Sequence, residues 1–435
     1  MNDKKKIYVL FGGNTAERQV SVMSGTNVWL KLQGSQKYDA FLFFLAPDMT
    51  VYRLPYAFAL SHTVEEIWHN CQEAATINAR LKPYITDIRN KLGLDVSSIA
   101  GSVLAEDDHL KSVTLTEFIA MAKYDDAFVF IGLHGGIGED GRLQQMLDDT
   151  GVSYTGSGPI ASALCMDKSK TAEVLKKSEA EAQGLSKISI DLNDTLNITA
   201  IWNQAIVQFK SLSDTFIIKP RCDGCSAGVV RLYSKSDLEV YIRLLKQKVA
   251  YIPSDTLTQQ FNIVEISPET GTEFILEPFV VTDELLIEGA ELKHTVTTGW
   301  LELTVGVLET YGQYYALNPS ITIAQSHVLT IEEKFQGGTG VNLTPPPVDV
   351  ISAKQTQYIR AVLERVAKIL GIENYTRIDL FFNHKTNQII IIEANSLPGL
   401  TPSTVIYHQA LAENPPIAPR VFLEQLIESA LCKTA

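Results

Sequence analysis

The chain has 435 residues, 45% of them hydrophobic, and its 50 Asp and Glu residues outnumber its 37 Lys and Arg residues, which gives a net charge of −13. This length allows two to four domains with buried cores, and the acidic balance disfavours binding to nucleic acid or to an anionic membrane. Five scattered cysteines, and no apolar run suited to a signal peptide or a membrane span, predict a cytoplasmic protein with reduced thiols.

The amino-terminal part of the sequence is typical of an open α/β sheet. Residues 7–11 and 40–45 are apolar runs that predict buried strands, and residues 20–32 predict the helix between them. Ligands of such sheets bind at the carboxyl ends of the strands. Glu17 lies in the turn after the first strand, where its charge either favours the positive end of the following helix or meets a ligand.

A further buried strand is predicted at residues 128–133, and the glycine-rich segment that follows it begins with His134. Glycines at the carboxyl end of a strand let the backbone approach a ligand closely, although a structural turn is an alternative. Residues 160–178 predict helical structure that carries Lys168. The helical apolar spacing of residues 61–92 more often indicates a buried face than a partner surface.

The centre of the chain contains a candidate phosphate-binding loop. Residues 216–220 predict a short strand with Lys219 near its end, and residues 221–228 form a loop of mostly small residues. Phosphate binding needs accessible backbone N–H groups and a nearby positive charge, and this segment offers both without the spacing of a P-loop. The lone C-x-x-C pair of Cys222 and Cys225 is weak evidence for zinc or redox chemistry.

Two apolar segments near the carboxyl end predict a hairpin. Residues 377–382 and 389–395 predict buried strands, and the polar residues 383–388 predict the turn between them. Ahead of the hairpin, residues 353–370 predict a helix, and residues 332–340 predict a mobile lid.

Four polar side chains interrupt these apolar strands. Because side chains alternate along a strand, Arg377 and Asp379 share one face, and Glu393 and Asn395 share the corresponding face of the other strand. Two carboxylates and an amide oxygen are the hard ligands that Mg²⁺ prefers, and such ions commonly hold nucleotide phosphates. The alternative is a charge network that ties two strands together.

Several of these segments together resemble the D-alanine:D-alanine ligase family of the ATP-grasp superfamily, in the same order along the chain. The resemblance rests on residues 12–21, 134–141, 154–168, 219–228, 377–379 and 393–399. It implies a mixed α/β ATP-grasp fold in which an N-terminal open parallel α/β domain, residues 1–157, binds substrate. Two ATP-grasp subdomains, residues 158–278 and 279–435, would then enclose the nucleotide.

The resemblance implies a function in peptidoglycan precursor synthesis. ATP would phosphorylate the carboxylate of one D-alanine, and the amine of a second D-alanine would attack the acyl phosphate. Two Mg²⁺ ions, or Mn²⁺ in their place, would assist, and the family's usual state predicts a homodimer. At matching positions, the residues that would contact the nucleotide are Lys168, Lys219, Gly224, Ser226, Gly228, Glu277, Glu302 and Lys334.

The resemblance also assigns the reacting groups. Asp379, Glu393 and Asn395 would hold the metal ions, while Arg377 and the backbone N–H near Gly399 would stabilise the acyl phosphate and the tetrahedral intermediate. Glu17 would bind the ammonium of the first D-alanine with His134 nearby. Cys225 and Phe335 match the positions that usually complete a catalytic triad with that glutamate, and Thr404 matches a position that binds the second substrate.

Three of those positions depart from the family pattern. Phe335 replaces a common tyrosine and Cys225 a common serine, so the hydrogen-bonded triad that these hydroxyls form with the glutamate at Glu17 is broken. Thr404 replaces a serine that binds the carboxylate of the second substrate. Relatives changed at the tyrosine position include ones that accept D-lactate or D-serine, so the identity of the second substrate stays open. Two alternative functions also stay open: another ATP-grasp carboxylate-amine ligase, and a non-catalytic nucleotide-binding protein.

Two stretches, roughly residues 61–118 and 282–298, look longer than in typical family members. The sequence gives no purpose for either.

Overall fold

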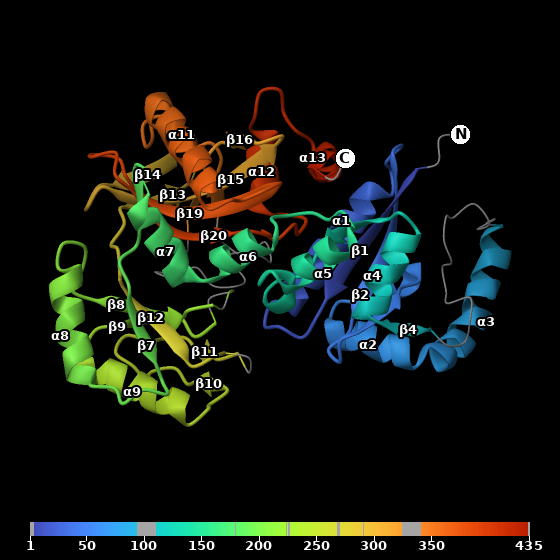
Figure 1. Ribbon diagram of the computed structural model, residues 1–435, viewed down its shortest axis with the longest axis horizontal. Coiled ribbons are helices and arrows are strands. Elements are labelled where there is room, and N and C mark those ends of the chain that lie inside the picture. Colours follow the sequence, from blue (N-terminus) through green and yellow to red (C-terminus); the bar gives the residue numbers. More distant parts are fainter. Residues whose placement is uncertain are drawn as a thin grey trace.

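The computed structural model describes residues 4–93, 110–178, 180–222, 224, 227–267, 270–289, 291–323 and 341–433. Four predicted site residues, Cys225, Ser226, Lys334 and Phe335, lie outside these described residues, as does the whole of the predicted lid. The described chain forms three units of mixed α/β structure, one on the right of Figure 1 and two on the left. Within the described ranges, no helix is long and apolar enough to cross a membrane.

The N-terminal unit is a five-stranded sheet in the order β4-β3-β2-β1-β5. Strands β2 and β5 run parallel to β1, whereas β3 and β4 run antiparallel to their neighbours. Its elements are β1 (Lys5–Gly12), α1 (Arg18–Leu32), β2 (Tyr38–Leu45), β3 (Thr50–Arg53), η1 (Tyr56–Leu60), α2 (Val64–Gln72), α3 (Ala74–Leu92), β4 (Ser112–Thr114), α4 (Leu115–Tyr124), β5 (Phe128–Ile131), η2 (Gly136–Gly138) and α5 (Arg142–Thr150). The strands and the first helix predicted for this part of the chain are confirmed.

The segment 61–92, predicted as one amphipathic stretch, forms the two helices α2 and α3. Thr63 begins α2 by accepting the backbone N–H of Glu66 with its hydroxyl, and Pro83 lies inside α3. The apolar side of α2, with Val64 and Ile67, belongs to the N-terminal core. For α2, the interpretation of the apolar spacing as a buried face is therefore confirmed.

The middle unit is an antiparallel sheet in the order β7-β12-β8-β9, with helices α8 and α9 packed on it. Its elements are β7 (Ile188–Asp191), α8 (Ile198–Phe209), β8 (Phe216–Pro220), β9 (Val230–Leu232), α9 (Lys235–Lys246), β10 (Tyr251–Ile252), β11 (Val264–Glu265) and β12 (Glu273–Pro278). Large buried rings fill its core, among them Trp202, Phe216, Tyr241 and Phe274. This packing fixes the carboxyl end of β8, where Lys219 lies.

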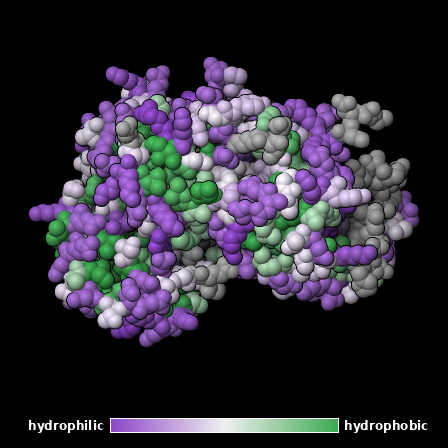
Figure 2. All heavy atoms as spheres, in the orientation of Figure 1, coloured by the Kyte–Doolittle hydropathy of each residue, from purple (hydrophilic) through white to green (hydrophobic). Residues whose placement is uncertain are grey.

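The C-terminal unit is a second five-stranded sheet, in the order β16-β15-β19-β20-β6. Its elements are β13 (Glu284–Glu288), β14 (Glu291–Thr295), β15 (Trp300–Thr310), β16 (Gln313–Ala316), β17 (Ile321–Ile323), β18 (Val341–Leu343), α11 (Ala353–Ile369), β19 (Tyr375–Asn383) and β20 (Ile389–Asn395). The edge strand β6 (Ala182–Gly184) comes from earlier in the chain and pairs in parallel with β20. Figure 2 shows apolar side chains on this face over the two left-hand units, within a mostly hydrophilic surface.

The helical structure predicted for residues 160–178 is confirmed, but it is divided at Asp167 into α6 (Pro159–Met166) and α7 (Lys168–Lys177). Asp167 between them has extended backbone, and its carboxylate accepts the backbone N–H groups of Ser169 and Lys170, which caps α7. The break matters for the site, because it places Lys168 in the first turn of α7 with its side chain buried.

The last two helices, α12 (Val405–Leu411) and α13 (Pro419–Lys433), return the chain to the N-terminal unit. Figure 1 shows α13 beside that unit, and Phe422 and Leu423 belong to the same buried core as Phe11 of β1. The side-chain amide of Asn27 in α1 also donates to the carbonyl of Leu400 at 2.7 Å. The first and last segments of the chain therefore hold the N-terminal and C-terminal units together.

Candidate active site

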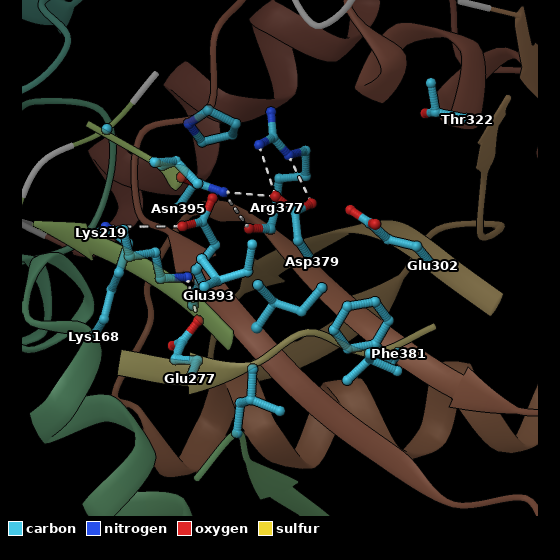
Figure 3. Close-up of a pocket in the computed structure, with 18 of the residues that line it drawn as sticks. Lys168, Lys219, Glu277, Glu302, Thr322, Arg377, Asp379, Phe381, Glu393 and Asn395 are labelled. Atoms are coloured by element: carbon cyan, nitrogen blue, oxygen red, sulfur yellow. Dashed lines mark hydrogen bonds and ion pairs between the residues drawn. The ribbon is translucent and has the colours of Figure 1, made fainter. Parts of the chain in front are cut away.

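The predicted hairpin is present as β19 and β20, in the register that brings its four polar residues together. Arg377 lies opposite Asn395, and Asp379 lies opposite Glu393, directly before a register shift. The guanidinium of Arg377 donates two hydrogen bonds to Asp379, at 3.1 and 2.9 Å, and the Asn395 amide lies 3.3 Å from the same carboxylate. Figure 3 shows these side chains gathered on one side of the hairpin.

Charge balance in this cluster depends on the partly buried ion pair of Arg377 and Asp379. Burial alone would lower the pKa of the Arg377 guanidinium, but the Asp379 carboxylate beside it holds that pKa above its ordinary value. The hydroxyl of Thr304 on β15 also donates to Asp379. The oxygens of Asp379, Glu393 and Asn395 form a donor set of two carboxylates and one amide, which fits a hard divalent cation such as Mg²⁺.

A second charged group lies on the opposite side of the same space. Lys219 at the end of β8 contacts the Glu277 carboxylate on β12 at 2.8 Å, and Lys187 contacts the other oxygen of that carboxylate. Lys168 lies 3.8 Å from Glu393 and so joins this group to the hairpin cluster (Figure 3). Burial lowers the pKa of the Lys187 ammonium, while Lys219 and Lys168 face the cavity, where cationic groups suit a phosphate.

The pKa values of this group reflect the same arrangement. Burial opposes ionisation of Glu277, yet the ammonium groups of Lys187 and Lys219 hold the pKa of its carboxyl below the ordinary value. Burial likewise opposes the charge on Lys219, and the carboxylates of Glu277 and Glu393 raise its pKa despite it. Glu277 and Lys219 are therefore both charged at neutral pH.

These two groups line one cavity of about 670 Å³ between the three units. The cavity also has an apolar wall, since Leu185, Val280 and Phe381 belong to one small cluster of buried residues that faces it. Glu302 lies beside Phe381 at this end (Figure 3). The predicted site residues that line the cavity are Glu17, His134, Lys168, Lys219, Gly224, Glu277, Glu302, Arg377, Asp379, Glu393, Asn395 and Gly399.

At the N-terminal side of the cavity, the Glu17 carboxylate lies against glycines of two loops. Glu17 occupies the N-cap position of α1, and its side chain makes no capping hydrogen bond. A Cβ atom on Gly224 would lie 2.5 Å from one Glu17 oxygen, and a Cβ atom on Gly135 would lie 2.9 Å from the other. A side chain at Gly224 would therefore require the Glu17 carboxylate to shift, so the glycine at this position of the phosphate loop lets the backbone lie directly against the carboxylate.

His134 is buried beside Glu17 in the same region. Its Nε2 lies 2.9 Å from the Ser24 hydroxyl, and its Nδ1 lies 3.4 Å from the Glu139 carboxylate. The Ser24 hydroxyl also accepts the backbone N–H of Leu400 at 3.1 Å. This chain of contacts orients the imidazole and links it to the segment that carries Gly399.

Two predicted residues, Gly228 and Thr404, lie outside the cavity lining among the described residues. The Thr404 hydroxyl donates to the Gly399 carbonyl at 2.6 Å. The Gly228 carbonyl accepts the Tyr241 hydroxyl at 2.6 Å, which anchors the end of the phosphate loop. Cys222 is exposed, and its partner in the C-x-x-C pair is among the residues that are not described.

Three residues in or beside the site were not predicted as site residues from the sequence, namely Lys187, Thr304 and Glu139. Lys187 is a lone lysine before a short strand, and only the antiparallel pairing of β7 with β12 brings it to Glu277. Thr304 lies in an alternating strand where threonine is common, and Glu139 lies in a segment in which only its neighbour His134 was singled out. Of the three, Glu139 could have been predicted as a site residue, because it is an acidic residue in that glycine-rich segment.

Comparisons with known proteins agree with this geometry. The chain matches the description "D-ala D-ala ligase N-terminus" over residues 6–157 and "D-ala D-ala ligase C-terminus" over residues 272–428, which together make up most of its length. The D-alanine–D-alanine ligase of Lacticaseibacillus casei is 26% identical over 409 residues, which cover 94% of this chain and 91% of the relative.

Solved structures show the same fold. The VanG D-Ala:D-Ser ligase from Enterococcus faecalis aligns with a TM-score of 0.63 at 18% identity, covering 98% of this chain and 100% of the other. The D-alanine–D-alanine ligase from Bacillus anthracis complexed with ATP aligns with a TM-score of 0.60 at 18% identity, covering 100% and 99%. The fold is the mixed α/β ATP-grasp fold that the sequence predicted, and the chain belongs to the D-alanine–D-alanine ligase family.

Proposed function

We propose that this chain is an ATP-dependent ligase that joins the carboxylate of D-alanine to the amine of a second D-alanine, releasing ADP and phosphate. The observation that carries the proposal is the meeting, in one cavity, of an oxygen-rich hairpin, a buried pair of lysines and a carboxylate suited to an ammonium group. A ligase that activates a carboxylate with ATP needs all three.

In the first step, a carboxylate oxygen of D-alanine attacks the γ-phosphorus of ATP. A new O–P bond forms while the bond from the γ-phosphorus to the bridging oxygen breaks, and ADP leaves. Lys168 and Lys219 hold the phosphates, because both ammonium groups line the cavity, Lys168 beside Glu393 and Lys219 beside Glu277. Glu17 binds the ammonium of D-alanine at the N-terminal side of the cavity and so orients its carboxylate toward ATP.

In the second step, the amine of the second substrate attacks the carbonyl carbon of the acyl phosphate. The C–N bond forms, the C–O bond to phosphate breaks, and the amine loses a proton. The Arg377 guanidinium, held in place by Asp379, stabilises the negative charge that develops on the oxygens. Gly399 lines the same cavity, and a backbone N–H near it would supply a neutral donor.

Divalent cations complete the proposal. Asp379, Glu393 and Asn395 would hold Mg²⁺, or Mn²⁺ in its place, and the ions would neutralise charge on the nucleotide phosphates. We also expect a homodimer in the cytoplasm, as is usual for the family. Light scattering of the purified chain measures the oligomeric state, and a mass of one chain would contradict the dimer.

The test is phosphate release with Mg²⁺ and ATP, over a panel of D-alanine alone and D-alanine with D-serine or D-lactate. D-Alanine alone should stimulate release strongly, and mass spectrometry should identify the dipeptide. If only the D-lactate mixture gave product, the alternative of a D-alanine–D-lactate ligase would be favoured, consistent with Phe335 in place of tyrosine. ATP binding without stimulation by any D-substrate would reject the ligase.

A further inference from the structure

A separate polar cluster lies at the rim of the cavity, beside the β13–β14 hairpin. Asp283 precedes the β13–β14 hairpin, His294 lies in β14, and His384 lies in the turn after β19. Both imidazoles direct Nε2 at the same oxygen of Asp283, at 3.1 and 3.0 Å. The three potential ligand atoms all lie within 4.8 Å of one another.

Backbone hydrogen bonds hold the Asp283 carboxylate through the oxygen that the imidazoles do not contact. Its other oxygen accepts the backbone N–H groups of Thr297, Thr298 and Gly299 at 2.8, 2.9 and 2.8 Å. The Asp283 side chain is 0% exposed, and its own backbone N–H donates to the Trp300 carbonyl. Burial opposes its ionisation, but these backbone donors hold the pKa of Asp283 well below its ordinary value, so the carboxylate is charged.

We propose that Asp283, His294 and His384 form a binding site for a divalent transition metal, with Zn²⁺ as its occupant. Two imidazole nitrogens and one carboxylate oxygen are a common protein ligand set for Zn²⁺, whereas Mg²⁺ prefers oxygens alone. Bond lengths of about 2.05 Å in a tetrahedral site separate neighbouring ligand atoms by about 3.3 Å. The two His–Asp separations of 3.0 and 3.1 Å need to open by a few tenths of an ångström, and the two imidazole nitrogens, within 4.8 Å of each other, need to settle at the same spacing.

The surroundings match what a metal site requires beyond its ligands. Backbone N–H groups orient the carboxylate in the way that outer hydrogen bonds orient metal ligands in proteins. The two imidazole side chains are 15% and 19% exposed, so one side of the cluster is open to an entering ion. On binding, each Nε2 lone pair faces the ion and the ring proton lies on Nδ1.

The metal would hold the β13–β14 hairpin against the five-stranded sheet of the C-terminal unit. The hairpin already rests on the C-terminal core through Leu285 and Leu292, while His384 belongs to the turn that joins β19 to β20. Since Asp283 and Glu284 line the cavity, the ion would also fix the wall nearest Glu302. This gives the stretch 282–298 a structural purpose, independent of the proposed ligase reaction.

The competing explanation is a hydrogen-bonded His-Asp-His network without metal, and glutamine variants separate the two. A glutamine at 294 or 384 keeps an N–H donor for Asp283 but replaces a strong nitrogen ligand with a poor one. The matched control is His408→Gln, because His408 is exposed on α12 and lies outside the cluster. Glu393→Gln serves as a second control for zinc bound at the catalytic carboxylates.

The experiment measures zinc retained by the full chain after dialysis in excess Mg²⁺, together with the visible spectrum of the Co²⁺-loaded chain. We expect one zinc ion per chain in the wild type, in His408→Gln and in Glu393→Gln, and zinc binding at least about tenfold weaker in His294→Gln and His384→Gln. Co²⁺ should show the intense visible bands of a tetrahedral site. Zinc should also raise the melting temperature of the wild type by a few degrees and leave His384→Gln unchanged.

Two results would overturn the proposal. One is wild-type protein that retains no more zinc than His294→Gln and gives only the weak Co²⁺ spectrum of an octahedral aquo ion. The other is equal zinc retention in the wild type and both glutamine variants. Neither result depends on ligase activity, so failure here is distinguishable from failure of the proposed function.

Discussion

The replacement Glu277→Gln tests the charge balance of the nucleotide side of the cavity. The Glu277 side chain is 3% exposed and is shared by Lys187 and Lys219. Removing one partner of a buried ion pair costs about 3–5 kcal/mol, because the remaining charges stay buried without compensation. The matched control is Glu273→Gln on the same strand, since Glu273 is 55% exposed and its pair with Arg221 should contribute at most about 1 kcal/mol.

Hydrogen exchange of the β8 and β12 amides, followed by mass spectrometry, measures this difference locally. A loss of about 3 kcal/mol speeds exchange through opening of the sheet by about a hundredfold or more, whereas the control should change it by at most about fivefold. Equal exchange in the two variants would refute the inference that Glu277 compensates two buried ammonium groups.

The same variant also tests how the stabilisation by Glu277 depends on pH. The folded-state pKa of Glu277 lies below its ordinary value of 4.5, so its stabilising contribution is complete above about pH 4.5 and is lost as the pH falls through the folded-state pKa. The gap in β12 exchange between wild type and Glu277→Gln should therefore narrow in acid. A gap that widened as the pH fell would contradict the sign of this shift.

Four further predictions concern catalysis. Glu393→Gln should lower turnover by at least about a hundredfold with the fold intact, as judged by circular dichroism, whereas Glu288→Gln on the exposed part of the β13–β14 hairpin should be neutral. Arg377→Ala should give a similar loss in kcat with a smaller change in the KM for ATP, and a loss confined to KM would argue against stabilisation of the transition state. Chelation of divalent ions should abolish phosphate release and Mg²⁺ should restore it; activity that persisted in chelator would count against the metal ligands. Phe335→Tyr should shift product ratios toward an amine nucleophile over a hydroxy acid, and unchanged ratios would reject the triad argument.

The sequence predicted the hairpin of Arg377, Asp379, Glu393 and Asn395 because the relevant information is local. Polar residues at alternate positions of two apolar strands have few alternative arrangements, and the observed register is the one that alternation requires. The strands around Lys219 and the first helix were predictable for the same reason.

Features that depend on distant parts of the chain were not predictable in this way. The break at Asp167 follows from a capping geometry that a run of helix-forming residues conceals. The contact of Lys187 with Glu277 needs the order of strands in the middle sheet. The return of α13 to the N-terminal core joins residues from opposite ends of the sequence, which no periodicity indicates.

Oxygen transfer is the most direct test of the acyl phosphate at the centre of the account. D-Alanine labelled with ¹⁸O in its carboxylate is incubated with ATP, Mg²⁺ and the chain, and the released phosphate is analysed by mass spectrometry. Each released phosphate should carry one ¹⁸O atom, because the carboxylate oxygen that attacks the γ-phosphorus remains bonded to phosphorus when phosphate leaves. Phosphate that carries no label, released while the dipeptide forms, would contradict it.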